Sequence, residues 1–137
     1  MSFSPDLLKE RVAIVTGGGT GIGLATAQAL ADHGADVVVT ARHLERLEAA
    51  AEAIRRRGRR ALAVGCDISD AGQVAAMFER VDREFGRVDI LINNAAANFI
   101  RPSEMLTPVR WRKVIDIVLN GTFYCTLEAG RRMIARK

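Results

Sequence analysis

The chain has 137 residues, of which 49% are apolar and 26% charged, and its formal net charge is +4. This is the composition of a globular protein, and the length suits one ordinary domain but not two. No stretch approaches the ~20 consecutive apolar residues that a membrane span requires, and the segment before Arg11 lacks the pattern of an export signal. We therefore expect one soluble domain over residues 1–137, with no membrane partner.

Much of the positive charge lies between Arg55 and Arg60 and in residues 131–137. A nucleic-acid-binding surface would combine such charge with aromatic side chains or a recognition helix. The first cluster instead straddles Gly58, where a helix is expected to end, and cations near a helix C-terminus complement its dipole. We interpret the cluster as a solvated helix end and expect no nucleic-acid partner.

Cys66 and Cys125 are far apart in the sequence and match no metal-ligand or redox spacing. Two isolated thiols of this kind are typical of a reducing compartment, where they are buried or half-buried. We therefore expect no bound metal and a cytoplasmic location.

Strands and helices alternate along the chain. Four short, mostly apolar runs have the character of strands covered on both faces: Val12–Thr16, Asp36–Thr40, Ala61–Cys66 and Asp89–Asn93. Helical patterns separate them at Gly21–His33, Leu44–Arg57 and Val74–Phe85, the last with Ser69 or Asp70 as N-cap and Gln73 in its first turn. A final and longest helix begins at Thr107-Pro108 and contains an irregularity near Gly121.

This alternation predicts an α/β fold with a doubly wound parallel sheet in the strand order 3-2-1-4. Strand four would then be an unpaired edge beside a helix whose apolar residues need partners: Trp111, Val114, Ile115, Val118, Leu119 and Phe123. We therefore expect the chain to be the N-terminal part of a single domain, incomplete at its C-terminus. Alone, it is expected to self-associate.

A glycine-rich turn, T-G-G-G-T-G-I-G, runs from Thr16 to Gly23 between the first strand and the first helix. Its glycines allow the backbone to turn sharply and to approach a pyrophosphate, which the N-terminus of the following helix also favours. No lysine follows Gly23, so the pattern is not that of an ATP-binding phosphate loop. A glycine turn without a ligand is the alternative, but the strand-turn-helix context favours a dinucleotide site.

Three features together resemble the short-chain dehydrogenase/reductase family, and they extend over nearly the whole chain. They are the glycine-rich turn, Asp67 after the third strand, and Asn93-Asn94-Ala95 after the fourth. The resemblance implies a Rossmann-type, nicotinamide-dependent oxidoreductase, typically a homotetramer. It implies that Gly17, Gly21 and Gly23 hold the pyrophosphate, that Asp67 and Ile68 border the adenine, and that Asn93 to Ala95 support the nicotinamide side. Thr20 and Ile22 complete the predicted cofactor site. Taken singly, Asp67 and the two asparagines could be ordinary turn residues.

The end of the second strand indicates which dinucleotide is bound. An NAD site usually has a carboxylate about 20 residues beyond the turn, whereas a 2′-phosphate favours arginine. The segment here is Val39-Thr40-Ala41-Arg42-His43. We expect Arg42 to contact the 2′-phosphate of NADP(H); an idle surface charge is the alternative.

Two further strings, N-N-A-A-A-N-F from Asn93 and D-I-V-L-N-G-T from Asp116, resemble 2,4-dienoyl-CoA reductases. Val118 stands where most of the larger family has a proton-relay asparagine, and valine can neither donate nor accept a proton. The resemblance implies that Asn98 helps to stabilise an enolate oxygen of an acyl-CoA thioester, although Ala97 departs from the glycine usual there. We interpret Asn120 as structural.

The function expected from this resemblance is NADPH-dependent reduction of 2,4-dienoyl-CoA or 2-enoyl-CoA thioesters in fatty-acid metabolism. The family's tyrosine and lysine lie beyond Lys137, and Tyr124 is not part of a Y-x-x-x-K pattern, so it is assigned to a core or interface. The 137 residues alone are therefore expected to show no turnover. An NADPH-dependent 3-oxoacyl or carbonyl reductase and a non-catalytic dinucleotide-binding module remain as alternatives.

Overall fold

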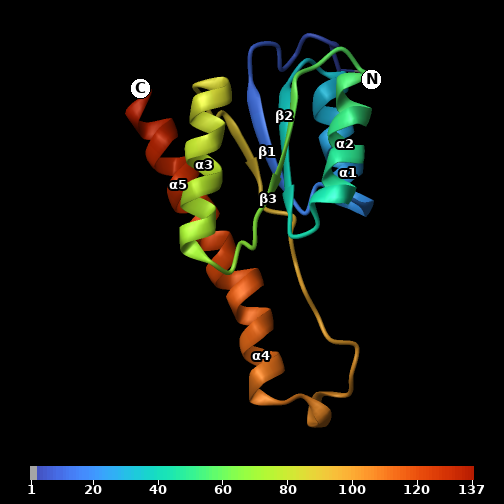
Figure 1. The fold of residues 1–137 in the computed structure, drawn as a ribbon, viewed down its shortest axis with the longest axis vertical. Coiled ribbons are helices and arrows are strands. Elements are labelled where there is room, and N and C mark those ends of the chain that lie inside the picture. The colour runs from blue at the N-terminus through green and yellow to red at the C-terminus, as the bar shows by residue number, and fades with distance from the viewer. Residues whose placement is uncertain (1–2) are drawn as a thin grey trace.

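The computed structural model describes residues 3–137, and its centre is a parallel sheet in the order β3-β2-β1-β4 (Figure 1). The strands are β1 (Val12–Thr16), β2 (Asp36–Ala41), β3 (Ala61–Gly65) and β4 (Ile90–Ile92). β1 is central and fully buried, pairing Val12 with Asp36 of β2 and Ala13 with Ile90 of β4. The predicted doubly wound sheet and its strand order are confirmed.

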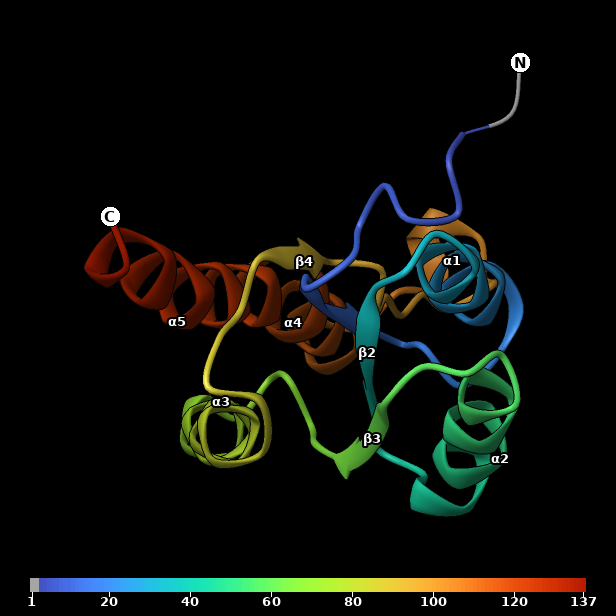
Figure 2. The same cartoon turned by 90° about the horizontal axis from the view of Figure 1, so that it is seen from above.

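Helices cover both faces of the sheet (Figure 2). α1 (Gly21–Asp32) and α2 (Leu44–Arg55) pack on one face, and α3 (Ala71–Phe85) and α5 (Thr122–Ala135) pack on the other. Alternate strand residues divide between the two cores, so that Val15 packs on the α1–α2 side and Ile14 on the α3–α5 side. This arrangement leaves the carboxyl ends of the strands open between the helical layers, where ligands bind in such folds.

The largest difference from the predicted boundaries is at α3, which begins at Ala71 and not at Val74. Asp70 is its N-cap, because its carboxylate accepts hydrogen bonds from the N–H groups of Gly72 and Gln73. Ser69 instead donates its hydroxyl to Asp67, at 2.7 Å. Of the two predicted N-caps, Asp70 is the one confirmed, and the helix begins three residues before the apolar pattern at Val74.

The long C-terminal helix is continuous through α4 (Pro108–Ile115), a π-helical segment (Asp116–Gly121) and α5. Thr107 caps it by accepting from the N–H of Arg110, so the predicted start is confirmed. The π segment is the predicted irregularity. A Cβ on Gly121 would lie 2.7 Å from Cγ1 of Ile68, so the glycine allows the helix to approach the loop after β3 closely.

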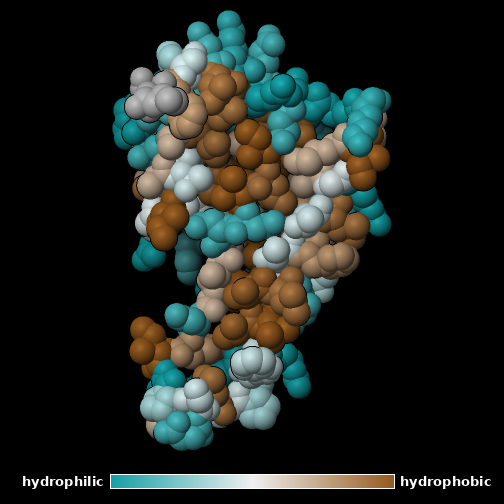
Figure 3. Space-filling model, turned by 180° about the vertical axis from the view of Figure 1, so that it is seen from behind, coloured by the Kyte–Doolittle hydropathy of each residue, from teal (hydrophilic) through white to brown (hydrophobic). Residues whose placement is uncertain are grey.

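The long C-terminal helix leaves apolar side chains exposed. Side chains of this kind project from α4, the π segment and α5: Val109, Trp111, Val118, Leu119, Phe123 and Ile134. Figure 3 shows apolar side chains gathered on this side of the molecule, including its protruding lower part. None of the helices within residues 3–137 is both long and apolar enough to cross a membrane.

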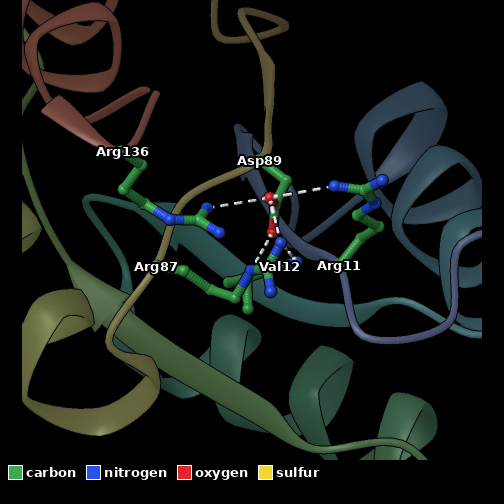
Figure 4. A network of polar contacts seen from close by, with 5 residues as sticks. All are labelled: Arg11, Val12, Arg87, Asp89 and Arg136. Carbon is green, nitrogen blue, oxygen red and sulfur yellow. Dashed lines mark hydrogen bonds and ion pairs between the residues drawn. The ribbon is translucent and has the colours of Figure 1, made fainter. Parts of the chain in front are cut away.

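A buried carboxylate joins the amino ends of β1 and β4 to the C-terminal helix (Figure 4). Asp89 accepts the N–H of Val12 at 2.8 Å and two hydrogen bonds from Arg87, at 2.6 and 2.7 Å. Arg136 donates to the same carboxylate at 3.0 Å, and Arg11 lies 3.5 Å from it. Burial alone would raise the pKa of Asp89, but the hydrogen bonds from Arg87, Val12 and Arg136 outweigh it and hold this pKa well below its usual range.

Candidate cofactor site

A pocket of about 490 Å³ lies at the carboxyl ends of the strands, beside the start of α1. This volume is in the range of small-molecule and cofactor sites. Ten of the eleven residues predicted to hold a cofactor line it: Gly17, Thr20, Gly21, Ile22, Gly23, Arg42, Asp67, Ile68, Asn94 and Ala95. Residues that are distant in the sequence thus converge on one cavity.

The glycine turn has the backbone that its sequence predicts. Gly17 and Gly21 have positive φ values of 65° and 54°, and the N–H of Gly17 donates to the carbonyl oxygen of Thr40 at 2.7 Å. A Cβ on Gly23 would overlap the carbonyl oxygen of Gly17 and lie 2.5 Å from Nδ2 of Asn94. A side chain at Gly23 would therefore displace the turn, and the absence of one lets the first turn of α1 face the pocket.

Asn94 and Thr16 hold the turn to the segment that follows β4. Nδ2 of Asn94 donates to the carbonyl oxygens of Thr16 and Gly17, at 3.0 and 3.2 Å. The buried Thr16 hydroxyl accepts the N–H groups of Asn94 and Ala95, both at 3.0 Å, and donates to the carbonyl oxygen of Ile92. The sequence does not indicate this bracing role for either residue, although both stand in motifs that it displays and Asn94 also lines the pocket.

Asn93 lies outside the pocket lining. Its side-chain amide donates to the Thr126 hydroxyl at 3.0 Å, and that hydroxyl donates to the carbonyl oxygen of Thr122. The first asparagine of the pair thus contacts α5, and the second contacts the glycine turn.

Asp67 and Ile68 border the pocket at the end of β3, opposite Ile117 of the π segment. Oδ1 of Asp67 accepts both the N–H and the hydroxyl of Ser69, which makes the residue part of a turn. Oδ2 has no hydrogen-bond partner within residues 3–137. The carboxylate therefore stabilises the loop with one oxygen and leaves the other able to accept from a ligand.

Two buried groups form the floor of the pocket. Thr40 is fully buried, and its hydroxyl has no hydrogen-bond partner among the described residues. Burial, followed by the charge of Asp67, raises the pKa of Cys66 to about 11. Burial likewise raises the pKa of Cys125 to about 12. Both cysteines are buried, as predicted, and both thiols are protonated at neutral pH.

Arg42 lies exposed at the pocket rim, directly after β2. It forms no ion pair within residues 3–137, and the strand ends on Ala41 with no carboxylate beside it. This environment suits an anionic group of a ligand better than a ribose hydroxyl pair.

Asn98 lies on the exposed segment between β4 and α4, and it does not line the pocket. The guanidinium of Arg110 lies over the Phe99 ring, 5.8 Å from its centroid, beside this asparagine. Its predicted catalytic role stays a prediction. Val118 is 43% exposed and also outside the pocket lining, whereas Tyr124 packs against the core on the α3–α5 side, as expected.

Asn120 has the structural role assigned to it. Its amide donates to Oδ1 of Asp116 at 3.0 Å, within the π segment. Within residues 3–137, no three His, Cys, Asp or Glu side chains are grouped in a way that could hold a metal ion.

The residues present fit a dinucleotide. Glycine at positions 17 and 23 lets the turn pack closely against Asn94, where a Cβ would clash, and the buried Thr40 hydroxyl, which has no hydrogen-bond partner among the described residues, belongs to a residue that lines the same cavity. A parallel sheet with such a turn before its first helix defines a dinucleotide-binding α/β domain of the Rossmann type.

Comparison with known proteins identifies the family. The family model described as "short chain dehydrogenase" matches residues 11–137. The chain belongs to this family of oxidoreductases.

Individual relatives are similar over most of the chain. A Caenorhabditis elegans protein named "Probable 2,4-dienoyl-CoA reductase 3" is 48% identical over 95% of this chain and 43% of its own length. The peroxisomal 2,4-dienoyl-CoA reductase of Danio rerio is 43% identical over 88% of this chain and 41% of its own. The chain therefore spans less than half the length of these relatives.

Solved structures agree with the fold. A short chain dehydrogenase from Bacillus anthracis is 46% identical, with a TM-score of 0.89 over 94% of this chain and 54% of that one. A metagenomic short-chain oxidoreductase in complex with NADP is 36% identical, with a TM-score of 0.88 over 94% and 59%. An NAD⁺-bound xylitol dehydrogenase is 32% identical, with a TM-score of 0.90 over 94% and 50%. Both dinucleotides thus occur among the structural neighbours.

Proposed function

We propose that the chain is part of an NADPH-dependent reductase of 2,4-dienoyl-CoA or 2-enoyl-CoA thioesters. The observation that carries this proposal is the string N-N-A-A-A-N-F from Asn93 to Phe99, which directly follows a strand of the cofactor pocket. The names of the C. elegans and zebrafish relatives support the same substrate class.

The cofactor is proposed from the pocket rim. Arg42 supplies a positive charge where an NAD site usually has a carboxylate, so it would pair with the 2′-phosphate of NADPH. Gly17, Gly21 and Gly23 would hold the pyrophosphate against the start of α1, and the free oxygen of Asp67 would accept from the adenine amino group. Bound NADPH would supply the hydride, and the chain's own task is binding and orientation.

Asn98 is the residue proposed to stabilise the enolate oxygen that forms from the substrate thioester. An amide N–H donated to the thioester oxygen would stabilise the negative charge that develops there as an enolate forms. Val118 cannot take the place of a relay asparagine, because its side chain neither donates nor accepts hydrogen bonds. The substitution therefore favours enolate chemistry over ordinary alcohol oxidation.

The test is NADPH oxidation by the full-length protein of which the chain is proposed to be part, with dienoyl-CoA, enoyl-CoA and 3-oxoacyl-CoA substrates. We expect the dienoyl or enoyl thioester to be preferred, and Asn98→Ala to lower kcat about 100-fold, as loss of an oxyanion donor does. Ser103→Ala, in the same exposed segment, is the matched control and should leave kcat unchanged. A preference for the 3-oxoacyl substrate would instead establish a carbonyl reductase, and binding without turnover by any substrate would establish a dinucleotide-binding module.

Assembly and location are part of the same proposal. A homotetramer would cover the apolar side chains that α4 and α5 expose, and light scattering on the full chain tests this. A cytoplasmic location remains proposed from the two free, buried cysteines, although the zebrafish relative is named as peroxisomal. Imaging of the tagged full chain would decide between the two compartments.

A further inference from the structure

Asp67 lines the cofactor pocket, and two residues that do not line it hold Asp67 in place. The hydroxyl of Ser69 donates to Oδ1 of Asp67 at 2.7 Å, and the N–H of Ser69 donates to the same oxygen at 3.0 Å. The N–H of Asp67 itself donates to Oε1 of Gln73 at 2.9 Å. Ser69 therefore orients the carboxylate, and Gln73 holds the backbone that carries it.

Gln73 is in turn anchored at the start of α3. Its side-chain amide donates to Oδ2 of Asp70 at 3.2 Å, while Oδ1 of Asp70 accepts the N–H groups of Gly72 and Gln73. Val74, the next residue of the helix, is fully buried in the core. The capped end of a packed helix thus supports the loop that brings Asp67 to the pocket.

The hydrogen bonds matter because an aspartate side chain has no strong orientation of its own. Its χ2 torsion has broad minima, so the partners of the carboxylate decide where each oxygen lies. Since Ser69 occupies Oδ1, Oδ2 of Asp67 is the oxygen left for a ligand. The neighbouring Ile68 also lines the pocket, and its N–H has no hydrogen-bond partner within residues 3–137. One acceptor and one donor are therefore free on adjacent residues.

An acceptor beside a donor matches the edge of adenine, whose 6-amino group donates and whose N1 accepts. Hypoxanthine has the reverse pattern, because its 6-oxo group accepts and its N1–H donates. A carboxylate that was free to turn or shift could still accept from this N1–H. Discrimination between the two bases therefore requires that Asp67 be held in one position.

We propose that Ser69 and Gln73 are positioning residues of the dinucleotide site, which hold Asp67 so that the site selects adenine over a 6-oxo purine. This inference rests on the proposed contact between Asp67 and adenine and adds two residues that act through it. Because neither side chain lines the pocket, their effect on the base is indirect.

The experiment measures binding of NADP⁺ and of its deamino analogue, nicotinamide hypoxanthine dinucleotide phosphate, to the full-length protein by calorimetry. The two ligands carry the same phosphates and differ only in the base. Wild type should bind NADP⁺ about tenfold more tightly, as one hydrogen bond to a charged group implies. Ser69→Ala and Gln73→Met should each reduce this ratio to about threefold, by weakening NADP⁺ and leaving the analogue unchanged. Ser69→Thr, which keeps the hydroxyl, should retain the wild-type ratio.

The matched control is Ser103→Ala, the same change at an exposed position outside the pocket, which should not alter the ratio. Ser69 is half-buried and Gln73 is exposed, so these changes should preserve the fold, and urea midpoints verify this. A ratio that stays at the wild-type value in both Ser69→Ala and Gln73→Met would overturn the inference. An equal loss of affinity for both ligands would also overturn it, because that is the result of a purely structural role.

Asp67→Ala separates the inference from the proposal on which it rests. If only this variant loses the preference for adenine, the contact of Asp67 stands and the positioning role falls. A wild-type protein that binds both ligands equally would reject both. The ratio requires no turnover of an acyl-CoA, and NAD⁺ with its own deamino analogue replaces the pair if the protein prefers NAD⁺. Failure of the proposed substrate or of the NADPH preference is therefore distinguishable from failure of the positioning role.

Discussion

Replacing Asp89 by asparagine tests whether the buried carboxylate at the amino ends of β1 and β4 stabilises the fold. The side chain is 8% exposed and accepts hydrogen bonds from Val12, Arg87 and Arg136. Asparagine has nearly the same shape, but it has no charge and replaces one acceptor oxygen with a donor. At least one guanidinium or backbone N–H would then face an amide N–H.

The size of the effect follows from the exposure of the partners. Breaking a fully buried ion pair by removing one partner costs about 3–5 kcal/mol, because the other charge is left without a partner. Here the arginines can regain water, since the side chain of Arg11 is 55% exposed and that of Arg136 is 41% exposed. Arg87 still loses its bidentate pair with the carboxylate, and hydrogen bonds to charged groups contribute about 1.5–3 kcal/mol each. We therefore expect a loss of about 2–3 kcal/mol in the free energy of unfolding.

Urea unfolding of wild type and Asp89→Asn measures this loss as a lower midpoint, by about 1 M for a chain of this size. Asp32→Asn is the matched control, because within residues 3–137 Asp32 pairs only with Arg57 and its side chain is 53% exposed. Exposed pairs contribute about 0–1 kcal/mol. A loss in Asp89→Asn no greater than in Asp32→Asn would refute the reasoning.

The same pair of proteins gives a pH test. The pKa of Asp89 is depressed in the folded state, so its stabilisation is complete above the unfolded-state pKa of about 3.9 and declines as the pH falls from there toward the folded pKa. The difference between wild type and Asp89→Asn should therefore be constant from about pH 5 to pH 8 and shrink below pH 4. A difference that grows on acidification would contradict this sign.

Three further predictions concern the site. Gly23→Ala should lower stability by about 1–3 kcal/mol and abolish dinucleotide binding, because its Cβ overlaps the Gly17 carbonyl oxygen; unfolding and calorimetry test this. Cys66 and Cys125, with pKa values raised to about 11 and 12, should resist iodoacetamide at pH 8 until urea unfolds the chain, as mass spectrometry would show. Thr16→Val, which keeps the shape but removes three hydrogen bonds, should cost about 2 kcal/mol and weaken dinucleotide binding; an unchanged affinity would contradict the role given to this hydroxyl.

The sequence was sufficient to predict the sheet and the main wall of the pocket. Four apolar strands separated by helices limit the topology to few choices, and parallel strands bring all their carboxyl ends to one edge. Residues that follow different strands, such as Gly17, Arg42 and Asp67, must therefore meet there. Local patterns also located the cap at Thr107, because a threonine before proline is a strong helix start.

The sequence could not show which of two adjacent asparagines holds the turn. The chain leaves its extended conformation after Ile92, so the alternation of a strand no longer determines the direction of the next side chains. Asn93 contacts Thr126 and Asn94 contacts Thr16 only because of backbone angles that no spacing encodes. The Asp89 cluster was missed for a related reason: its contacts join residues 47 and 77 positions apart.

The residues at one end of the sheet stabilise the fold, and those at the other end also shape the cofactor pocket. Variants at the two ends can therefore separate an effect on stability from an effect on binding. At the amino ends, Asp89 joins β1, β4 and the C-terminal helix far from the pocket lining. At the carboxyl ends, Thr16 and Asn94 join the same two strands, but their hydrogen bonds also determine the shape of the glycine turn. A change at Asp89 should therefore alter unfolding while leaving dinucleotide affinity intact, whereas a change at Thr16 alters both. The coupling arises because β1 ends directly in the turn, so the residue that closes the strand also supports the ligand site.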